Sequence, residues 1–244
     1  MANEFAKMRH LRVGLIATIL VVAVLGLSLI GVVSDPTFDP AAAGAWLSML
    51  AGLSLGIPLV APLLLAVLAS RQVDIEHQGS GWLLQTTAGL APGIVCRAKF
   101  CALGAVVLLA TLATSLVSLA LGRVLAGISA PPPLGHWAGF TACILVVNLT
   151  LLAAHVLLAA LVENQLIGLG LAVLGTLLGL FSKNLPEVLA HLTPWGCYAL
   201  AEAASYRDGE LVALPISYPS FVALGVLGGA VFTLVTSRFD RQEA

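Results

Sequence analysis

Long apolar stretches separated by short polar segments make up most of this 244-residue chain. A helix that crosses the bilayer core needs about 20 consecutive, mostly apolar residues. The stretches that meet or approach this length are Val13–Val33, Trp46–Ala69, Phe100–Gly122, Trp137–Val162, Gln165–Phe181 and Pro219–Ser237. The pattern therefore predicts an all-α, polytopic membrane protein with six transmembrane helices.

Composition supports a membrane protein with one domain. Hydrophobic residues make up 59% of the chain and charged residues 9%, whereas a soluble domain carries about 25% charged residues. We expect a single transmembrane domain over residues 1–244, with a surface segment at 1–12, a cytoplasmic segment at 70–98 and an extracytoplasmic segment at 182–218. The net charge of −1 indicates no broad basic surface for nucleic acid.

The basic residues divide unevenly between the two sides of the predicted membrane. Of 11 lysines and arginines, eight fall on one side and only Arg123, Lys183 and Arg207 fall on the other. Excess positive charge near helix ends marks the cytoplasmic face, so both termini should be cytoplasmic. The first apolar stretch is too long for a cleaved signal peptide, and we expect it to be retained.

The N-terminal segment is short and amphipathic. Phe5, Met8 and Leu11 recur at three-residue intervals, among charged residues that include Glu4, Lys7 and Arg9. This pattern predicts a helix that lies on the cytoplasmic membrane surface with its basic residues near anionic lipid. An ordinary basic flank of the first span is the alternative, and the two interpretations are compatible.

The segment between the second and third spans is the most polar connection. A polar group is followed by glycines that permit tight turning and then by an apolar edge, after which Pro92-Gly93 indicates a turn. We expect this segment to dock a soluble partner, because aromatic anchors are typical of interface hot spots. The alternative is that Trp82 is a residue of the membrane-interface belt. The residues concerned are Asp74, Glu76, His77, Gln78, Gly79, Gly81, Trp82, Leu83 and Leu84.

The longest outer segment, 182–218, carries two helix-start signals. Asn184 with Pro186, and Thr193 with Pro194, are typical of helix N-termini. We therefore expect two short helices, Leu185–Leu192 and Pro194–Tyr206. The second would carry Trp195 and Tyr198, and both would cap the bundle on its outer side.

One motif admits a catalytic interpretation. Gly52-Leu-Ser-Leu-Gly56 matches the G-x-S-x-G pattern of a serine nucleophile, for which His155 could be the base. That nucleophile needs a turn from a strand to a helix, and here the match lies inside a predicted span. The same glycines match G-x-x-x-G, a close-packing face between membrane helices. We favour the packing role and predict no catalytic residue.

Two polar residues in the fourth predicted span share one helix face. Asn148 and His155 lie seven residues apart, and polar residues at membrane depth usually face the bundle interior or a cavity. They could line a substrate pathway, but we favour hydrogen bonds between helices. The five histidines and four cysteines show no metal-ligand spacing, so no metal site is predicted.

The chain lacks the sequence of a phosphate-binding loop. None of its three lysines is followed by Ser or Thr, so no G-x-x-x-x-G-K-[ST] motif is present. The predicted spans also hold none of the Asp, Glu or Arg residues that ion-coupled carriers commonly need. If the protein moves a solute with ATP, another chain must hydrolyse it, and we expect no cofactor in this chain.

The chain resembles the membrane subunit of an ATP-binding-cassette exporter, and more narrowly the permeases of lantibiotic immunity and bacitracin resistance. The resemblance covers the whole length and is strongest at Asp74-Ile-Glu76-His-Gln-Gly79-Ser-Gly-Trp82-Leu-Leu, with Arg97-Ala-Lys99 opening the third span. It implies that this segment is a coupling helix seated in a groove of the ATPase. Leu192-Thr-Pro194-Trp195 also resembles a Pro-Trp motif of the family's outer segment.

The resemblance implies a transporter with two ATPase copies, which bind ATP and Mg, and a second permease that is identical or similar. It implies a bacterial cytoplasmic membrane and the export of a hydrophobic or amphipathic compound, with a peptide antibiotic as our first choice. Two other classes remain alternatives: an intramembrane serine hydrolase that uses Ser54 and His155, and a membrane scaffold without transport.

Overall fold

Six long helices form the body of the computed structural model, which describes residues 2–35, 38–42, 44–184, 186–207 and 210–242. Each is long and apolar enough to cross a membrane, which confirms the prediction of a helical membrane protein with six spans; the described chain adds one short hairpin to the helices. The long helices are α2 (Val13–Val33), α3 (Ala45–His77), α5 (Pro92–Val124), α6 (Leu134–Leu161), α7 (Gln165–Phe181) and α10 (Tyr218–Gln242).

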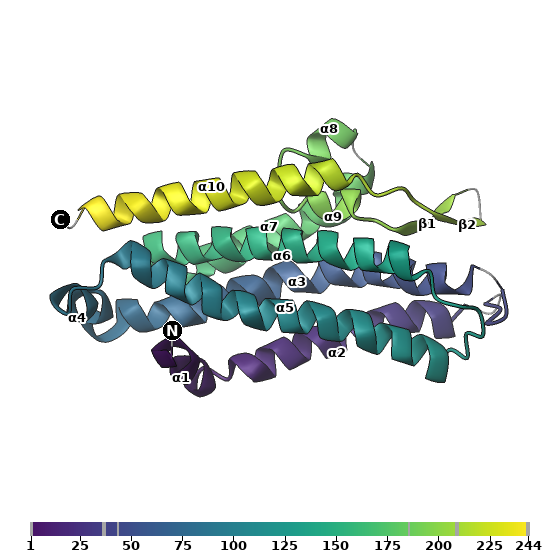
Figure 1. Ribbon diagram of the computed structural model, residues 1–244, viewed down its shortest axis with the longest axis horizontal. Helices are drawn as coiled ribbons and strands as arrows, with labels where there is room; N and C mark the ends of the chain where they lie inside the picture. Colours follow the sequence, from purple (N-terminus) through teal and green to yellow (C-terminus); the bar gives the residue numbers. More distant parts are fainter. Residues whose placement is uncertain (1, 36–37, 43, 185, 208–209, 243–244) are drawn as a thin grey trace.

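The short elements gather at the two ends of this bundle (Figure 1). At one end, α1 (Ala2–His10), the 3-10 turn η1 (Gln78–Ser80) and α4 (Gly81–Thr87) lie near the end of α10. At the other end are η2 (Ser182–Asn184), α8 (Glu187–Ala190), α9 (Cys197–Leu200) and a hairpin of β1 (Ala204–Arg207) and β2 (Glu210–Ala213). The eight basic residues grouped by the sequence fall at the first end.

Helix α3 lies at the centre of the bundle and packs against α2, α5, α6 and α7. A Cβ atom added at Gly52 would lie 2.7 Å from the backbone oxygen of Ser28, and one at Gly56 would lie 3.3 Å from that of Val24. The two helix backbones therefore approach closely along this face. The G-x-x-x-G interpretation of Gly52 and Gly56 as a packing face is confirmed.

Helices α3 and α5 extend beyond the predicted spans. Each has 33 residues, which gives a length of about 50 Å at about 1.5 Å per residue, against about 30 Å for the bilayer core. The additional residues lie at the end that carries α1 and α4. Pro92 begins α5 and does not mark a turn, so this expectation was wrong; Pro suits the first helical turn, where its missing N–H costs nothing.

The outer segment contains less helix than predicted. Helices α8 and α9 are one turn each, and the second ends at Leu200, so the expected helix to Tyr206 was wrong. Residues 204–207 instead pair antiparallel with 210–213, because each strand satisfies the backbone of the other. The dipeptide Asp208-Gly209 is a hairpin signal in the sequence. The expected helix start at Leu185 lies outside the described residues.

Candidate functional site

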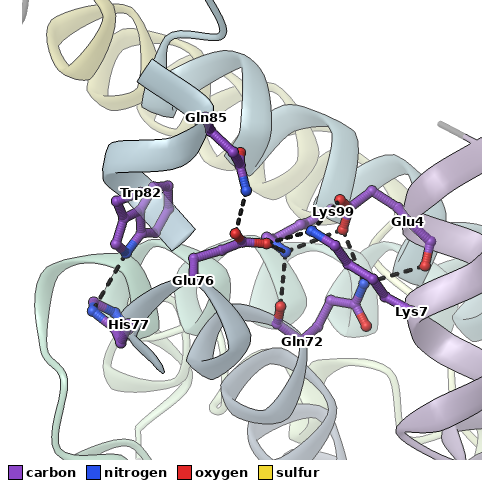
Figure 2. Close-up of polar contacts among 8 residues, drawn as sticks. All are labelled: Glu4, Lys7, Gln72, Glu76, His77, Trp82, Gln85 and Lys99. Atoms are coloured by element: carbon purple, nitrogen blue, oxygen red, sulfur yellow. Dashed lines mark hydrogen bonds and ion pairs between the residues drawn. The ribbon is translucent and has the colours of Figure 1, made fainter. Parts of the chain in front are cut away.

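Four charged side chains meet inside the end of the bundle that carries α1 and α4 (Figure 2). Glu4 and Lys7 come from α1, Glu76 comes from α3 and Lys99 comes from α5. The side chain of Lys99 is 0% exposed and that of Glu76 is 2% exposed. We call these four residues the buried charged cluster. It joins three helices that are far apart in the sequence.

Lys99 is the centre of the buried charged cluster. Its Nζ atom donates to Oε1 of Glu76 at 2.7 Å, to Oε2 of Glu4 at 3.1 Å and to the backbone oxygen of Gln72 at 2.8 Å. These three acceptors use all three protons of the ammonium group. Complete pairing is what allows a charged side chain to remain buried, because an unpaired buried ion is very costly.

Lys7 completes the charge balance. Its Nζ atom lies 2.6 Å from Oε1 of Glu76 and 3.2 Å from Oε1 of Glu4. Gln72 adds a hydrogen bond from its Nε2 to Oε2 of Glu4 at 3.0 Å. Two ammonium groups therefore face two carboxylates, and the cluster as a whole is neutral.

The cluster shifts the pKa values of the two residues that α1 contributes. Burial alone would raise the pKa of Glu4. The charge of Lys99 and the hydrogen bonds from Gln72, Lys99 and Lys7 together outweigh this effect, so the net pKa lies below 4.5. Burial lowers the pKa of Lys7, but the hydrogen bonds and charges of Glu76 and Glu4 raise it above 10.5. Both residues are therefore charged across the neutral range.

Helix α4 packs directly against Glu76 of α3. Nε2 of Gln85 donates to Oε2 of Glu76, which is the carboxylate oxygen that the lysines leave free (Figure 2). A Cβ atom at Gly81 would lie 2.8 Å from Cα of Glu76, so only glycine lets the two backbones approach this closely. The turn before α4 places Ser80 at a φ of 58°. One buried carboxylate thus holds α1, α4 and α5.

A second contact ties α4 to α6. The indole N–H of Trp82 donates to Nδ1 of His77 at 3.4 Å, and Nε2 of His77 lies 2.8 Å from the backbone oxygen of Ala159. An indole N–H can only donate, so Nδ1 is the acceptor and Nε2 carries the proton that binds Ala159. His77, at the end of α3, therefore bridges α4 and α6.

The outward face of α4 is apolar. Leu83 is 64% exposed and Leu84 is 65% exposed, whereas Trp82 is half-buried and packs against the core. Of the three residues of the apolar edge, the two leucines therefore face outward and Trp82 is directed partly inward. The polar group before α4 is also divided: Glu76 is buried, while Asp74 accepts a hydrogen bond from exposed Gln78.

The start of α5 is tied to the end of α10 by a separate ion pair. Nη2 of Arg97 lies 2.8 Å from Oδ2 of Asp240, and the backbone N–H of Ile94 donates to Oδ1 of Asp240 at 3.1 Å. Arg97 and Lys99 are close in the sequence, yet their side chains bind different partners: Arg97 binds Asp240, and Lys99 binds the buried carboxylates. Arg9, the third residue predicted for the surface helix, is exposed.

The polar residues of the fourth span contact the outer segment. Asn148 accepts a hydrogen bond from the Tyr198 hydroxyl at 2.6 Å and donates one to Oγ1 of Thr111 at 3.3 Å, so it joins α6 to α5 and to α9. His155 faces the ring of Trp195, with centroids 6.2 Å apart. Trp195 follows Pro194 and is buried against Gly175 of α7, where it closes the outer end.

The two residues of the hydrolase alternative have different neighbours. Oγ of Ser54 accepts the backbone N–H of Ala203 at 3.4 Å, while His155 faces Trp195. Ser54 lies within helix α3 and not at a turn between a strand and a helix. The arrangement therefore offers neither a strained nucleophile nor a base bonded to it.

Replacing Lys99 should remove the charge balance of the buried charged cluster and destabilise the protein. Lys99→Met leaves two buried carboxylates facing one ammonium group, and removing one partner of a buried pair costs about 3–5 kcal/mol. We expect a large fall in thermal stability in detergent. Arg97→Met is the control on the same helix, because its half-exposed pair contributes about 0–1 kcal/mol. Equal losses in the two variants would refute the central role of Lys99.

The cluster also predicts a pH dependence of stability. The lowered pKa of Glu4 gives a contribution that is present above pH 4.5 and is lost as pH falls through the folded-state value. The raised pKa of Lys7 gives a contribution that is present below pH 10.5 and is lost as pH rises through the folded-state value. Thermal unfolding against pH should show both limbs. Glu4→Gln should flatten the acid limb and Lys7→Gln the alkaline limb; unchanged limbs would contradict this assignment.

The family model described as ABC-2 family transporter protein matches residues 1–179 of the chain. The matched part contains α1, α4 and every residue of the buried charged cluster. A search of curated proteins gives no match. Since the family model covers well over half of a chain with six apolar helices, this multi-pass membrane protein belongs to the ABC-2 family of transporter proteins.

Proposed function

We propose that a separate ATPase drives this transporter subunit by pushing on α4, and that the buried charged cluster passes the movement into the bundle. ABC-2 membrane subunits have no ATPase domain of their own, and membership implies partnership with an ABC ATPase. The observation that carries the proposal is the position of α4, which exposes Leu83 and Leu84 while its other face rests on buried Glu76.

The contacts of α4 suit a coupling element. Two neighbouring exposed leucines on a short helix offer an apolar knob that a groove in a soluble partner can enclose. Exposed Gln78, which donates to Asp74, precedes α4 in the chain and adds polar groups to the same end of the bundle. The ATPase would thus contact Leu83 and Leu84 directly, while Glu76 would act from inside the membrane subunit.

A push on α4 reaches three helices through one carboxylate. Glu76 belongs to α3, accepts the Gln85 side chain of α4 and binds Lys99 of α5 and Lys7 of α1. Separating these groups would leave buried charges unpaired, which is costly. The four helices therefore move together at this end, and α3 carries the movement along the centre of the bundle.

The charge distribution supports a cytoplasmic position for α4. The basic residues Lys7, Arg9, Arg71 and Arg97 lie at the same end as α4, and the end of α10 adds Arg238 and Arg241. Under the positive-inside rule this end faces the cytoplasm, where ATP is available. We place the protein in the bacterial cytoplasmic membrane, with ATP and Mg bound by two copies of the ATPase.

We further propose that the substrate is an amphipathic compound, with a peptide antibiotic as the first candidate, and that a second permease completes the pathway. The long helices expose mostly apolar side chains, among them Leu109, Leu116 and Val226, which suits a substrate drawn from the membrane. The resemblance to lantibiotic-immunity and bacitracin-resistance permeases points to the same class.

The coupling proposal is tested by making the knob polar. Leu83→Ser with Leu84→Ser should abolish copurification of the ATPase and substrate-stimulated ATP hydrolysis in reconstituted vesicles, because the apolar contact is lost while the cluster stays intact. Leu189→Ser with Leu192→Ser, an exposed pair at the opposite end, is the matched control and should retain both. A lantibiotic peptide is the substrate probe.

Three results would contradict the proposal. ATPase association unaffected by the Leu83 and Leu84 changes would show that α4 is not the docking element. Hydrolysis that never responds to any amphipathic peptide would favour the scaffold alternative. Labelling of position 84 from the cell exterior would show that α4 lies outside the cell and not on the cytoplasmic side.

A further inference from the structure

A second hollow lies at the end of the bundle opposite α4, between the outer elements. It has a volume of about 430 Å³, which lies within the size range of ligand pockets. Its walls come from η2, α8, α9, β1 and the segment that leads into α10. The residues that matter for its chemistry are Ser182, Lys183, Glu202, Arg207 and Ser217. We call it the outer pocket.

Two of the three basic residues at this end of the molecule line the outer pocket. Lys183 follows α7, and Arg207 ends β1. Among the side chains that the structure describes, none forms an ion pair with either residue. Glu202 also lines the pocket, so the hollow carries a net positive charge of one. The third basic residue, Arg123, is occupied by the backbone oxygens of Ile128 and Ser129.

The walls of the outer pocket are anchored to the bundle. One wall follows α9, whose Tyr198 hydroxyl donates to Asn148 inside α6 at 2.6 Å. The other wall runs from Leu214 to Ser217 and is held by the hydrogen bond from Leu214 N–H to the Ala203 oxygen at 2.9 Å. One wall of the pocket is therefore tied to α6, and the other is tied to the segment between α9 and β1.

The pocket lies where a membrane helix ends on each side. Ser182 directly follows α7, and Ser217 directly precedes α10. Both helices expose large apolar side chains close to these ends, among them Leu178, Phe181 and Val222. In a bilayer such side chains face lipid tails, so the pocket is placed at the depth of the headgroups.

We propose that the outer pocket binds the phosphate group of an amphipathic molecule, and that Lys183 and Arg207 contact the phosphate oxygens. Arginine matches phosphate with two parallel hydrogen bonds, and lysine adds a point charge. The apolar ends of α7 and α10 accommodate the attached chains. Glu202 opposes a second negative charge, so the pocket selects a group with one negative charge, as in a phosphodiester headgroup. This inference does not depend on coupling to an ATPase.

Calorimetric titration of the purified chain in an uncharged detergent tests the proposal. Dioctanoyl phosphatidylglycerol should bind saturably, whereas dioctanoylglycerol, which has the same chains without phosphate, should not. Lys183→Gln with Arg207→Gln should raise the Kd about tenfold, because two charge-assisted contacts are lost. Glu202→Gln should lower the Kd about threefold, because an opposing charge is removed. Arg238→Gln makes the same type of change at an exposed site at the other end and should leave it unchanged.

The source of the phosphate is decided by a further arm with inorganic phosphate. Binding of phosphatidylglycerol alone identifies a lipid headgroup site, and binding of both with the same dependence on Lys183 and Arg207 identifies a site for free phosphate as well. An unchanged Kd in the double variant, or equal binding of dioctanoylglycerol, would overturn the proposal. Should the double variant unfold, a Glu202→Gln Kd that does not fall would overturn it equally.

Discussion

The ammonium group of Lys99, buried between the carboxylates of Glu4 and Glu76, is the interaction on which the arrangement of the α4 end depends. The desolvation of four charged side chains offsets much of their mutual attraction. A neutral and fully hydrogen-bonded cluster therefore contributes specificity more than stability: it defines one arrangement of α1, α3 and α5 and penalises any partial separation. Such an arrangement suits a part that must move as a unit.

The opposite end of the molecule is joined by a different chemistry. There, Trp195 packs against α7, Tyr198 reaches Asn148 inside the bundle, and the hairpin continues toward α10. These contacts are aromatic side chains and neutral hydrogen bonds, and they attach the outer elements to the helices beneath them. Movement that begins at the charged end would thus reach an outer end whose elements are also tied to the long helices.

The sequence predicted the six spans because lipid requires long apolar segments, and that requirement can be read locally. It also located the α4 region, through the change from apolar to polar residues after Ala69. The positions at which helices end were harder to predict. Residues 70–77 continue α3 although they are polar, because Gln72 and Glu76 find partners on α1 and α5. No local pattern contains that information, since Glu4 and Lys99 lie 95 positions apart.

The same limit explains the errors at the two sites. Glu76 and Trp82 were grouped with the exposed leucines because they are neighbours in the sequence. Ion pairs with Lys7 and Lys99 instead keep Glu76 buried, and Trp82 turns toward His77. The hairpin was missed although Asp208-Gly209 signals it, because helix-start signals dominated the outer segment. The outer pocket could not be predicted, since Lys183 and Arg207 line one hollow only because of the fold.

The most direct test of the account is a distance measured during the ATPase cycle. Spin labels at exposed Arg9 on α1 and exposed Val124 at the far end of α5, in a Cys101→Ser background, would report movement by pulsed electron resonance. With the ATPase bound, ATP should change this distance in the parent protein and leave it unchanged in Lys99→Met. The same ATP-dependent change in both proteins would contradict transmission through the buried charged cluster.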